Sequence, residues 1–253
     1  MTIEYWQLPI LFAVGLVAGF VDSIAGGGGL IALPTLLSLG LDPKTALGTS
    51  RFQGTFGSGS AAWHYMHGGA VSFKECARGF FLAAIGAAIG TLAVQQLDPS
   101  FLRRLLPIML GSVAVYALLR PAMGEQDHPP RISRGVFDMT FVFFIAMYDG
   151  FFGPGSGMFW TMAFVTVMGF NLTRATAHTK IMNFGSNLCS VAFFMSRGQV
   201  VFAAGLAMGA GQLLGARIGS RMVIKRGAKF IRPVFITAVL ALTAKLLYDA
   251  YLK

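Results

Sequence analysis

Two cations lie inside apolar stretches at equivalent places in the two halves of the chain. Arg51 ends the sequence GLDPKTALGTSR, and Lys180 ends the similar sequence GFNLTRATAHTK, 129 residues later. A cation in a membrane-type segment is costly unless it faces a cavity or a partner. The forked guanidinium of Arg and the point charge of Lys both suit a small oxyanion. We predict that the two cations clamp an anion. The alternative is that each lies near a helix start and extends to the lipid headgroups.

Hydroxyl and amide side chains accompany each cation. Arg51, Gly54 and Ser58 are spaced i, i+3, i+7 and therefore share one helical face. Asn183 and Asn187 share the equivalent face with Lys180. Such side chains donate the hydrogen bonds that an oxyanion accepts. The predicted substrate-binding residues of these two segments are Thr49, Ser50, Arg51, Gln53, Ser58, Thr179, Lys180, Asn183 and Asn187.

Glycine-rich sequences interrupt the two longest apolar segments at matching places. They are DSIAGGGG, residues 22–29, and DGFFGPGSG, residues 149–157. Non-helical backbone at membrane depth is tolerated only where it lines a cavity or meets other protein. We therefore predict broken helices, with short helices that begin near Leu30 and Met158 and point their N-terminal N–H groups at an anion. The alternative is close helix packing. The predicted substrate-binding residues of the breaks are Gly26, Gly27, Gly28, Gly29, Gly153, Gly155 and Ser156.

An acid precedes each break, and a histidine stands near one of the cations. Asp22 and Asp149 could neutralise the cations or carry a proton, and His178 could relay that proton. The structural alternatives are a loop or capping carboxylate for the acids and a fixed hydrogen bond for the histidine. We predict that ion coupling uses Asp22, Asp149 and His178.

The composition indicates the fold class that must position these residues. Hydrophobic residues make up 55% of the chain and charged residues 12%, which is more apolar than the surface of a soluble domain allows. We predict an all-α membrane protein that forms one polytopic domain over residues 1–253. Spanning helices need about 20 apolar residues. The sequence predicts about eight of them, at residues 6–39, 45–66, 73–97, 101–119, 137–168, 173–195, 200–223 and 230–252.

The eight segments fall into two homologous repeats of four. Repeat 1 covers about 6–119, a polar linker covers 120–134, and repeat 2 covers about 135–252. Four crossings per repeat predict that the copies point the same way across the membrane, unless a segment is re-entrant. Loop cations weakly favour an N-terminus outside the cell. The pairs Gly86/Gly90 and Gly215/Gly219 match between the repeats and predict close helix packing.

The sequence also bears on cofactors and partners. We expect no cofactor and no metal, since no G-x-x-x-x-G-K-[ST] sequence occurs and neither Cys76 nor Cys189 belongs to a ligand set. The net charge of +10 is typical of cationic loops that meet anionic lipid, so we expect no nucleic acid partner. The expected partners are a small anionic substrate and membrane lipid. A homodimer is a further assembly that we consider.

Two long sequences resemble the paired motifs of a known family. DSIAGGGGLIALPTLLSLGLDPKTALGTSRFQGTFGS and YDGFFGPGSGMFWTMAFVTVMGFNLTRATAHTKIMNFGSN are similar to the repeats of TauE/SafE membrane proteins, and the second resembles the YfcA-like branch. The resemblance covers nearly the whole chain. It implies eight transmembrane helices in the bacterial inner membrane and transport of sulfite, sulfonates or related organosulfur anions. Ser50-Arg51 stands where the first family motif often has Asn-Lys, so the charge is kept and the amide is not.

Together these features predict a secondary transporter and not an enzyme. It would move a small sulfur-containing oxyanion, of the sulfite or organosulfonate class, across the bacterial inner membrane with ion coupling. One alternative is a membrane-embedded enzyme or assembly factor acting on a lipid or sulfur compound. Another is a transporter of an unrelated anion.

Overall fold

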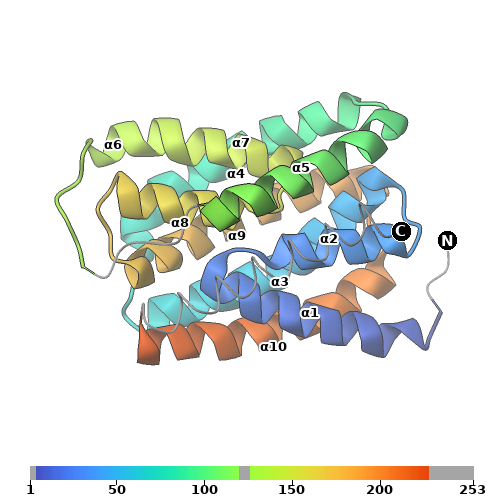
Figure 1. Cartoon of the computed structure of the whole chain (residues 1–253), viewed down its shortest axis with the longest axis horizontal. Coiled ribbons are helices and arrows are strands. Elements are labelled where there is room, and N and C mark those ends of the chain that lie inside the picture. The colour runs from blue at the N-terminus through green and yellow to red at the C-terminus, as the bar shows by residue number, and fades with distance from the viewer. Residues whose placement is uncertain (1–3, 120–125, 228–253) are drawn as a thin grey trace.

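The computed structural model describes residues 4–119 and 126–227, in which all regular secondary structure is helical (Figure 1). The predicted segment 230–252 and the first part of the predicted linker, residues 120–125, lie outside the described residues. The helices before the linker are α1 (Gln7–Ala25), α2 (Gly28–Ser38), α3 (Pro43–His67), α4 (Phe73–Gln96) and α5 (Pro99–Leu119). Those after it are α6 (Arg134–Phe137), the π-helix η1 (Asp138–Val142), α7 (Phe143–Phe151), α8 (Ser156–Thr166), α9 (Leu172–Ser196) and α10 (Phe202–Arg226).

Equivalent helices begin at equivalent residues. The 129-residue offset that relates the sequences also relates α3 to α9, at both ends, and the first residues of α4 and α10. The reason lies in the capping residues. The carboxylate of Asp42 accepts hydrogen bonds from the N–H groups of Lys44 and Thr45, and the side chain of Asn171 accepts one from the N–H of Arg174. Each side chain satisfies N–H groups that a first helical turn leaves free.

Both glycine-rich sequences interrupt a helix, as predicted. The first break lies between α1 and α2, and the second lies between α7 and α8. Gly26 and Gly155, which are equivalent positions, have φ angles of 78° and 85°. Glycine adopts this left-handed conformation without the steric cost that a Cβ would add. The short helices begin at Gly28 and Ser156, two residues earlier than predicted.

Each break also reverses the direction of the chain. The start of α2 lies against α1, because a Cβ at Gly28 would stand 2.7 Å from the carbonyl oxygen of Ala18. The end of α8 returns to the start of α6 and η1, where the rings of Phe137 and Phe164 are 4.8 Å apart. The N–H of Arg131 also donates to the carbonyl of Val167 over 2.9 Å. α1–α2 and α7–α8 are therefore helical hairpins that return to the end of the bundle from which they start (Figure 1).

The hairpins change the relation between the two halves. Gly48, Gly54 and Gly59 along α3 contact Phe194, Asn187 and Phe184 along α9 in reverse order. The equivalent helices α3 and α9 therefore run antiparallel. The halves are not parallel, and the exception stated for a re-entrant segment applies, because a hairpin that returns to its own side leaves an odd number of crossings. The halves instead have inverted topology, with a pseudo-twofold axis across the bundle.

Helices of one half pack against helices of the other half across that axis. α1 packs along α10, and α4 packs along α7. Glycines make these contacts close: Gly86 and Gly90 of α4 lie against the backbone of α7, and Gly215 of α10 lies against the backbone of α1. Gly219 likewise faces the backbone carbonyl of Phe20 in α1. The predicted close packing of both glycine pairs is thus confirmed, since small residues let helix backbones approach.

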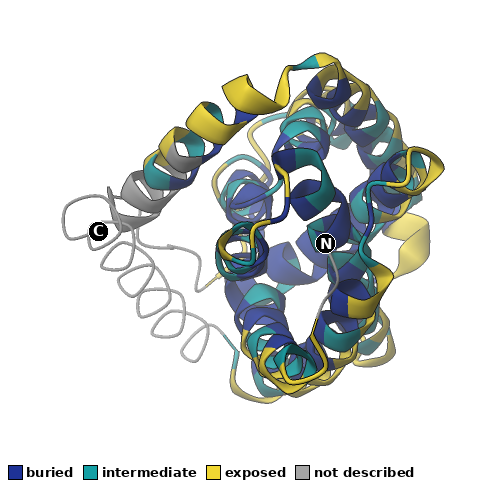
Figure 2. Cartoon of the chain, turned by 90° about the vertical axis from the view of Figure 1, so that its right-hand side faces the viewer, coloured by how far each residue is buried: buried dark blue, intermediate teal, exposed yellow. Residues whose placement is uncertain are grey.

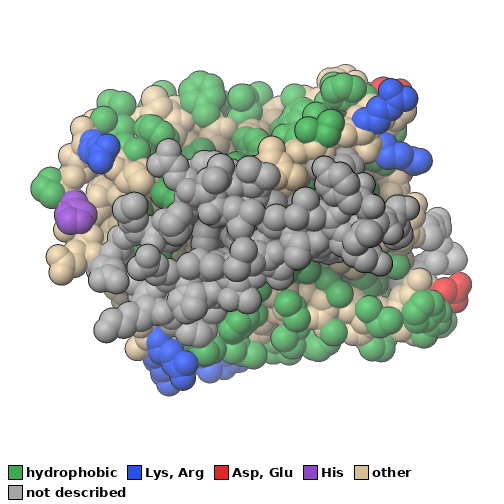
Figure 3. Space-filling view, in the orientation of Figure 1, with side chains coloured by type: hydrophobic (Ala, Val, Ile, Leu, Met, Phe, Trp, Pro, Cys, Tyr) green, Lys and Arg blue, Asp and Glu red, His purple; other side chains and the backbone are tan. Residues whose placement is uncertain are grey.

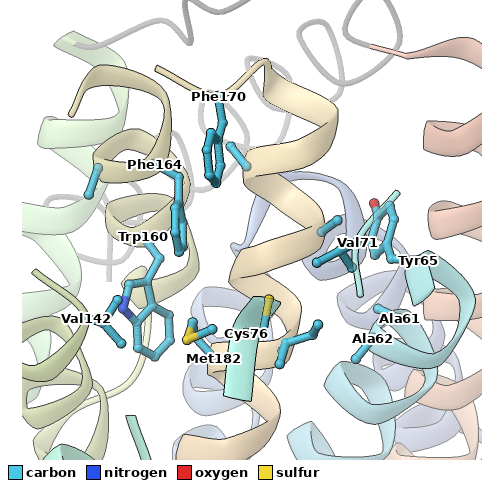
Figure 4. Packing of buried hydrophobic residues seen from close by; sticks show 14 of the residues in the cluster. Ala61, Ala62, Tyr65, Val71, Cys76, Val142, Trp160, Phe164, Phe170 and Met182 are labelled. Atoms are coloured by element: carbon cyan, nitrogen blue, oxygen red, sulfur yellow. The ribbon is translucent and has the colours of Figure 1, made fainter. Parts of the chain in front are cut away.

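A hydrophobic cluster holds the second hairpin in place. Trp160 and Phe164 of α8, Met182 of α9 and Val142 of η1 are buried together, and Phe170 closes the end of the cluster (Figure 4). Burial of aromatic side chains contributes strongly to packing. The cluster fixes α8 beside α9, which sets the position of the second break.

The outer surface is apolar along the sides of the bundle. Buried residues face inward and exposed residues face outward when the molecule is viewed along its helices (Figure 2). Exposed side chains on the outer faces include Phe81, Ile85 and Ile89 of α4 and Leu206 and Leu213 of α10. On the face shown in Figure 3, Lys and Arg side chains gather toward the two ends of the long axis, with hydrophobic side chains between them. This distribution fits a bundle that crosses a lipid bilayer.

Length and hydropathy alone identify fewer spans than the sequence pattern does. Among the described helices, α1 and α4 are long and apolar enough to cross a membrane by these criteria. α3 and α9 each have 25 residues, but they bear the polar and charged side chains described below. These side chains face the interior of the bundle, so the average hydropathy of both helices is low.

Candidate functional site

A cavity of about 50 Å³ lies where the two breaks meet the middle of α3 and α9. The breaks touch each other, since a Cβ at Gly26 would stand 2.5 Å from the backbone of Gly157. The volume suffices for a few waters or a small oxyanion. The predicted site residues that line the cavity are Asp22, Gly26, Gly29, Ser50, Arg51, Gln53, Asp149, Gly153, Gly155, Ser156, Asn183 and Asn187.

Arg51 is the cation that lines the cavity. Its Nη1 donates to Oδ1 of Asp149 over 2.8 Å and to Oδ1 of Asn187 over 3.1 Å. Its Nη2 is buried, and the described residues give it no hydrogen-bond partner. This atom lies against the second break, where a Cβ at Gly153 would stand 2.5 Å away. One face of the guanidinium is thus held by protein, and one donor remains for a ligand.

Asp149 is surrounded by donors. Besides Arg51, its carboxylate accepts hydrogen bonds from the hydroxyl of Ser156, over 2.6 Å, and from the hydroxyl of Ser186. Ser156 is the first residue of α8, so the carboxylate ties the end of α7 to the start of α8. The carboxylate thus neutralises a cation and also bridges the break, which are two of the roles that the sequence left open for it.

Lys180 does not line the cavity, which corrects the expectation that both cations face it. Its Nζ donates to Oδ2 of Asp22 over 2.8 Å, and its side chain is fully buried. Oδ1 of Asp22 accepts a hydrogen bond from the N–H of Gly28 at the start of α2. An ammonium group buried this deeply needs a carboxylate partner. Asp22 therefore lines the cavity, and Lys180 contacts Asp22 without lining the cavity itself.

Several predicted site residues lie outside the cavity and support it. The hydroxyl of Thr49 accepts a hydrogen bond from the N–H of Val201, and that of Thr179 pairs with Thr161. The hydroxyl of Ser58 accepts a hydrogen bond from the amide of Asn187, which helps to orient the amide that binds Arg51. Gly27 and Gly28 belong to the first break but do not line the cavity.

His178 lies with a different cluster of charges. Its ring packs against Phe164 and Phe170, and its Nδ1 lies 2.9 Å from the carbonyl of Arg174. Its Nε2 stands 3.9 Å from the carboxylate of Glu75 at the start of α4. This is the fixed hydrogen bond that was the alternative, and the ring is not among the groups that line the cavity.

Comparison with known proteins places the chain in a family. Residues 11–246 match the family described as Sulfite exporter TauE/SafE. A probable membrane transporter protein, ORF9, of Sinorhizobium sp is 44% identical over 98% of this chain and 95% of its own length. A probable membrane transporter protein of Haemophilus influenzae is 42% identical over 96% of this chain and 95% of its own length. YfcA of Escherichia coli, a probable membrane transporter protein, is 41% identical over 96% and 91%.

This chain belongs to the TauE/SafE family. The resemblance seen in the sequence is thereby confirmed. Membership makes the chain a membrane protein of a transporter family, and neither the family nor these relatives are described as enzymes. The alternative of a membrane-embedded enzyme is set aside on that ground. No solved structure matches the chain.

Two polar residues of this TauE/SafE site were not among the predicted site residues. Ser186 donates to Asp149, and Gln212 of α10 lines the cavity. Ser186 lies three residues after Asn183, so the helical spacing of the polar face could have identified it. Gln212 stands alone among the glycines of α10, and its equivalent in α4 is Ala83. The repeat therefore offered no signal for it.

Proposed function

We propose that this chain is a secondary transporter of a small sulfur-containing oxyanion, of the sulfite or organosulfonate class. The description of the family supports the substrate class, and the names of the relatives support transport. The site is consistent with this substrate class, because an arginine and the hydroxyl and amide side chains of Ser50, Asn183 and Asn187 line a small cavity. Oxyanions accept hydrogen bonds from such groups.

The free donor of Arg51 is the observation on which this proposal rests. A buried guanidinium nitrogen without a partner costs free energy, about 1–3 kcal/mol or more for a charged group. An oxyanion at this nitrogen would remove that cost. The site is also closed to bulky groups, because the breaks that form its wall touch each other at Gly26 and Gly157.

The inverted halves fit transport by alternating access. Many secondary transporters bind substrate between inverted repeats, at helices that are interrupted near the midplane. Here α2 and α8 begin at the breaks, and the cavity lies between them. We propose about eight helical segments in two repeats, 6–119 and 135–252, which together form one domain. Each repeat would comprise a re-entrant hairpin followed by three crossings of the bacterial inner membrane.

The charges at the ends of the bundle support one orientation. The end that holds the starts of α4, α6 and α9 and the C-terminal end of α10 has more cations than the opposite end. Its described cations are Lys74, Arg78, Arg131, Arg134, Arg174, Arg221, Lys225 and Arg226, against Lys44, Arg103, Arg104 and Arg197. Cytoplasmic ends are enriched in Lys and Arg. We therefore place this end in the cytoplasm and the start of α1 outside. The loop that contains Lys44 then lies outside as well.

Ion coupling is proposed to use Asp149. An anion that binds Arg51 competes with the carboxylate for the same guanidinium. A proton on Asp149 would release Arg51 for the anion, so anion and proton would bind together. Asp22 holds the equivalent place in the other half, with Lys180 as its partner. His178 is left out of this path because it lies in the Glu75 cluster.

Uptake into liposomes tests the proposed function. The purified protein is reconstituted, and flux of labelled sulfite, sulfate and small sulfonates is measured with and without a proton gradient. We expect flux of sulfite or of a sulfonate, faster with the gradient than without it, and no flux with Arg51→Met. Equal flux from empty liposomes and from liposomes with the wild type, for all these anions, would contradict the proposal.

A further inference from the structure

Two amide oxygens, of residues that line the same cavity as Arg51, are buried and, like its Nη2, have no partner among the described residues. They are Oε1 of Gln53 and Oε1 of Gln212. Both residues line the cavity, and their side chains are almost completely buried, with 1% and 2% of their surface exposed. A buried polar oxygen without a donor is unfavourable. Among the buried polar atoms of the residues that line the cavity, one donor and two acceptors therefore lack a partner.

The orientation of the Gln53 amide follows from its surroundings. Its Nε2 donates to the carbonyl of Ser50 over 3.0 Å, and the reversed amide would place two oxygens against each other. Gln212 comes from α10, and its Oε1 lies against Gly57 of α3, one helical turn beyond Gln53. Gln53 and Gly57 are four residues apart and share one face of the helix. The two glutamines thus lie on the same side of α3, and both line the cavity.

The charges around the cavity favour an anion with a single charge. Two cations, Arg51 and Lys180, are paired with two carboxylates, Asp149 and Asp22. The four formal charges cancel, so an anion of one charge leaves less unbalanced negative charge in the cavity than a dianion does. A ligand that presents only acceptors would also place its oxygens against the oxygens of Gln53 and Gln212, which is repulsive.

We propose that the ligand of this cavity is a small oxyanion of single charge that also carries a hydroxyl donor. Its anionic oxygen accepts from Nη2 of Arg51, and its O–H donates to the amide oxygen of Gln53 or Gln212. The hydroxyl belongs either to the acid group of a partly protonated oxyanion or to a carbon beside the anionic group. This inference rests on the proposed function and adds the part of the ligand that Arg51 does not recognise.

A matched pair of ligands tests the hydroxyl directly. 2-Hydroxyethanesulfonate and 1-propanesulfonate have the same anionic group and differ by a hydroxyl in place of a methyl. Binding of each to the purified full chain in detergent is measured by calorimetry. We expect the hydroxyl compound to bind at least about tenfold more tightly, since a site built for a hydroxyl rejects the analogue that lacks it.

Hydrogen sulfite and methanesulfonate supply the second arm, which distinguishes the acid hydroxyl from one on carbon. Both have one negative charge, and only the first has an acidic donor on its anionic group. Preference for hydrogen sulfite alone assigns the hydroxyl to the oxyanion itself. Preference for 2-hydroxyethanesulfonate assigns it to carbon.

Variants of the two glutamines show whether the amides cause the preference. Gln53→Met replaces the amide by the residue that the chain itself has at the equivalent position, Met182. Gln212→Met removes the amide that comes from α10. Each is expected to reduce the preference of the pair to within about threefold, mainly by weakening the binding of 2-hydroxyethanesulfonate. Gln95→Met is the control, because Gln95 is buried with both amide atoms unpartnered but does not line the cavity.

The outcomes separate this inference from the proposed function. Equal affinity of the wild type for the two members of each pair overturns the proposed recognition of a hydroxyl. The proposed anion transport would be unaffected by that result. A preference that survives in both Gln53→Met and Gln212→Met also overturns it. Failure of the wild type to bind any of the four anions overturns the proposed substrate class, and the hydroxyl with it. A preference lost in the cavity variants and kept in Gln95→Met supports the assignment.

Discussion

Nη1 of Arg51 in α3 lies 2.8 Å from Oδ1 of Asp149 in α7, so a cation of the first half pairs with an acid of the second. The reverse pair, Lys180 of α9 with Asp22 of α1, has the same length of 2.8 Å. The two ion pairs cross between the halves at the breaks. Ion pairs that link two halves of a transporter are well placed to respond when substrate binds between them.

Removing Arg51 should lower stability and abolish anion binding by separable effects. Arg51→Met leaves the buried carboxylate of Asp149 unpaired, which should cost about 3–5 kcal/mol of unfolding free energy. Adding Asp149→Asn removes the unpaired charge and should recover much of that loss. Anion binding should stay absent in the double variant, because the free Nη2 is gone. Unfolding in detergent and calorimetric anion binding measure the two effects. Binding by the double variant at wild-type affinity would refute the role of Arg51.

Removing Lys180 should act on the anion through Asp22. Lys180→Met leaves the carboxylate of Asp22 uncompensated at the cavity wall, and its charge should weaken anion binding by about tenfold or more. Asp22→Asn in the same protein removes that charge and should restore binding. This rescue distinguishes an effect of Lys180 through Asp22 from direct binding of the anion by Lys180. If Lys180 contacted the anion directly, Asp22→Asn would not restore the lost contact. Calorimetry on the single and double variants gives the comparison.

Contact between the breaks predicts that Gly157→Ala is destabilising. A Cβ at this position would stand 2.6 Å from the Cα of Gly26, and backbone cannot move aside as a flexible side chain can. Gly111 of α5 is the control, since a Cβ there meets nothing within 4 Å. Gly111→Ala should therefore stabilise the protein by about 0.5–1 kcal/mol, the usual gain in helix propensity. Thermal unfolding of the two variants in detergent measures the difference. Equal stabilisation of both would show that the breaks do not touch.

Coupling through Asp149 predicts a dependence of anion affinity on pH. A proton on this carboxylate releases Arg51, so affinity for a fully ionised sulfonate should rise as the pH falls. Asp149→Asn should bind tightly at every pH, and its flux in proteoliposomes should no longer respond to a proton gradient. Wild-type pH dependence of transport in Asp149→Asn would show that this carboxylate is structural and that coupling lies elsewhere.

Asp98 supplies the control for that experiment. It lies in the exposed turn between α4 and α5, where hydrogen bonds from Ser100 lower the pKa of its carboxyl. A lowered pKa means that this group stays ionised as the pH falls through the range in which most carboxyls begin to titrate. Asp98→Asn should therefore leave the pH dependence of anion affinity unchanged.

The sequence by itself identified the class of the protein, the interrupted helices and most of the cavity wall. Apolar composition, the repeat and glycine runs are local properties, so they were visible without a structure. Caps such as Asp42 and Asn171 act within one turn, which is why α3 and α9 begin where the repeat places them. Arg51, Asn183 and Asn187 share helical faces by spacing alone, and all three line the cavity.

Only the tertiary structure decided which groups meet. A glycine interruption is compatible with a kink or with a reversal of the chain, and packing of α2 against α1 and of α8 against α9 selected the reversal. The reversal inverted the second half relative to the first. Asp149 and Asp22 consequently pair with Arg51 and Lys180 across 98 and 158 residues of sequence, and Gln212 enters the cavity from α10. The spacing of residues within one helix cannot predict such pairings, because they arise from the way in which separate helices pack.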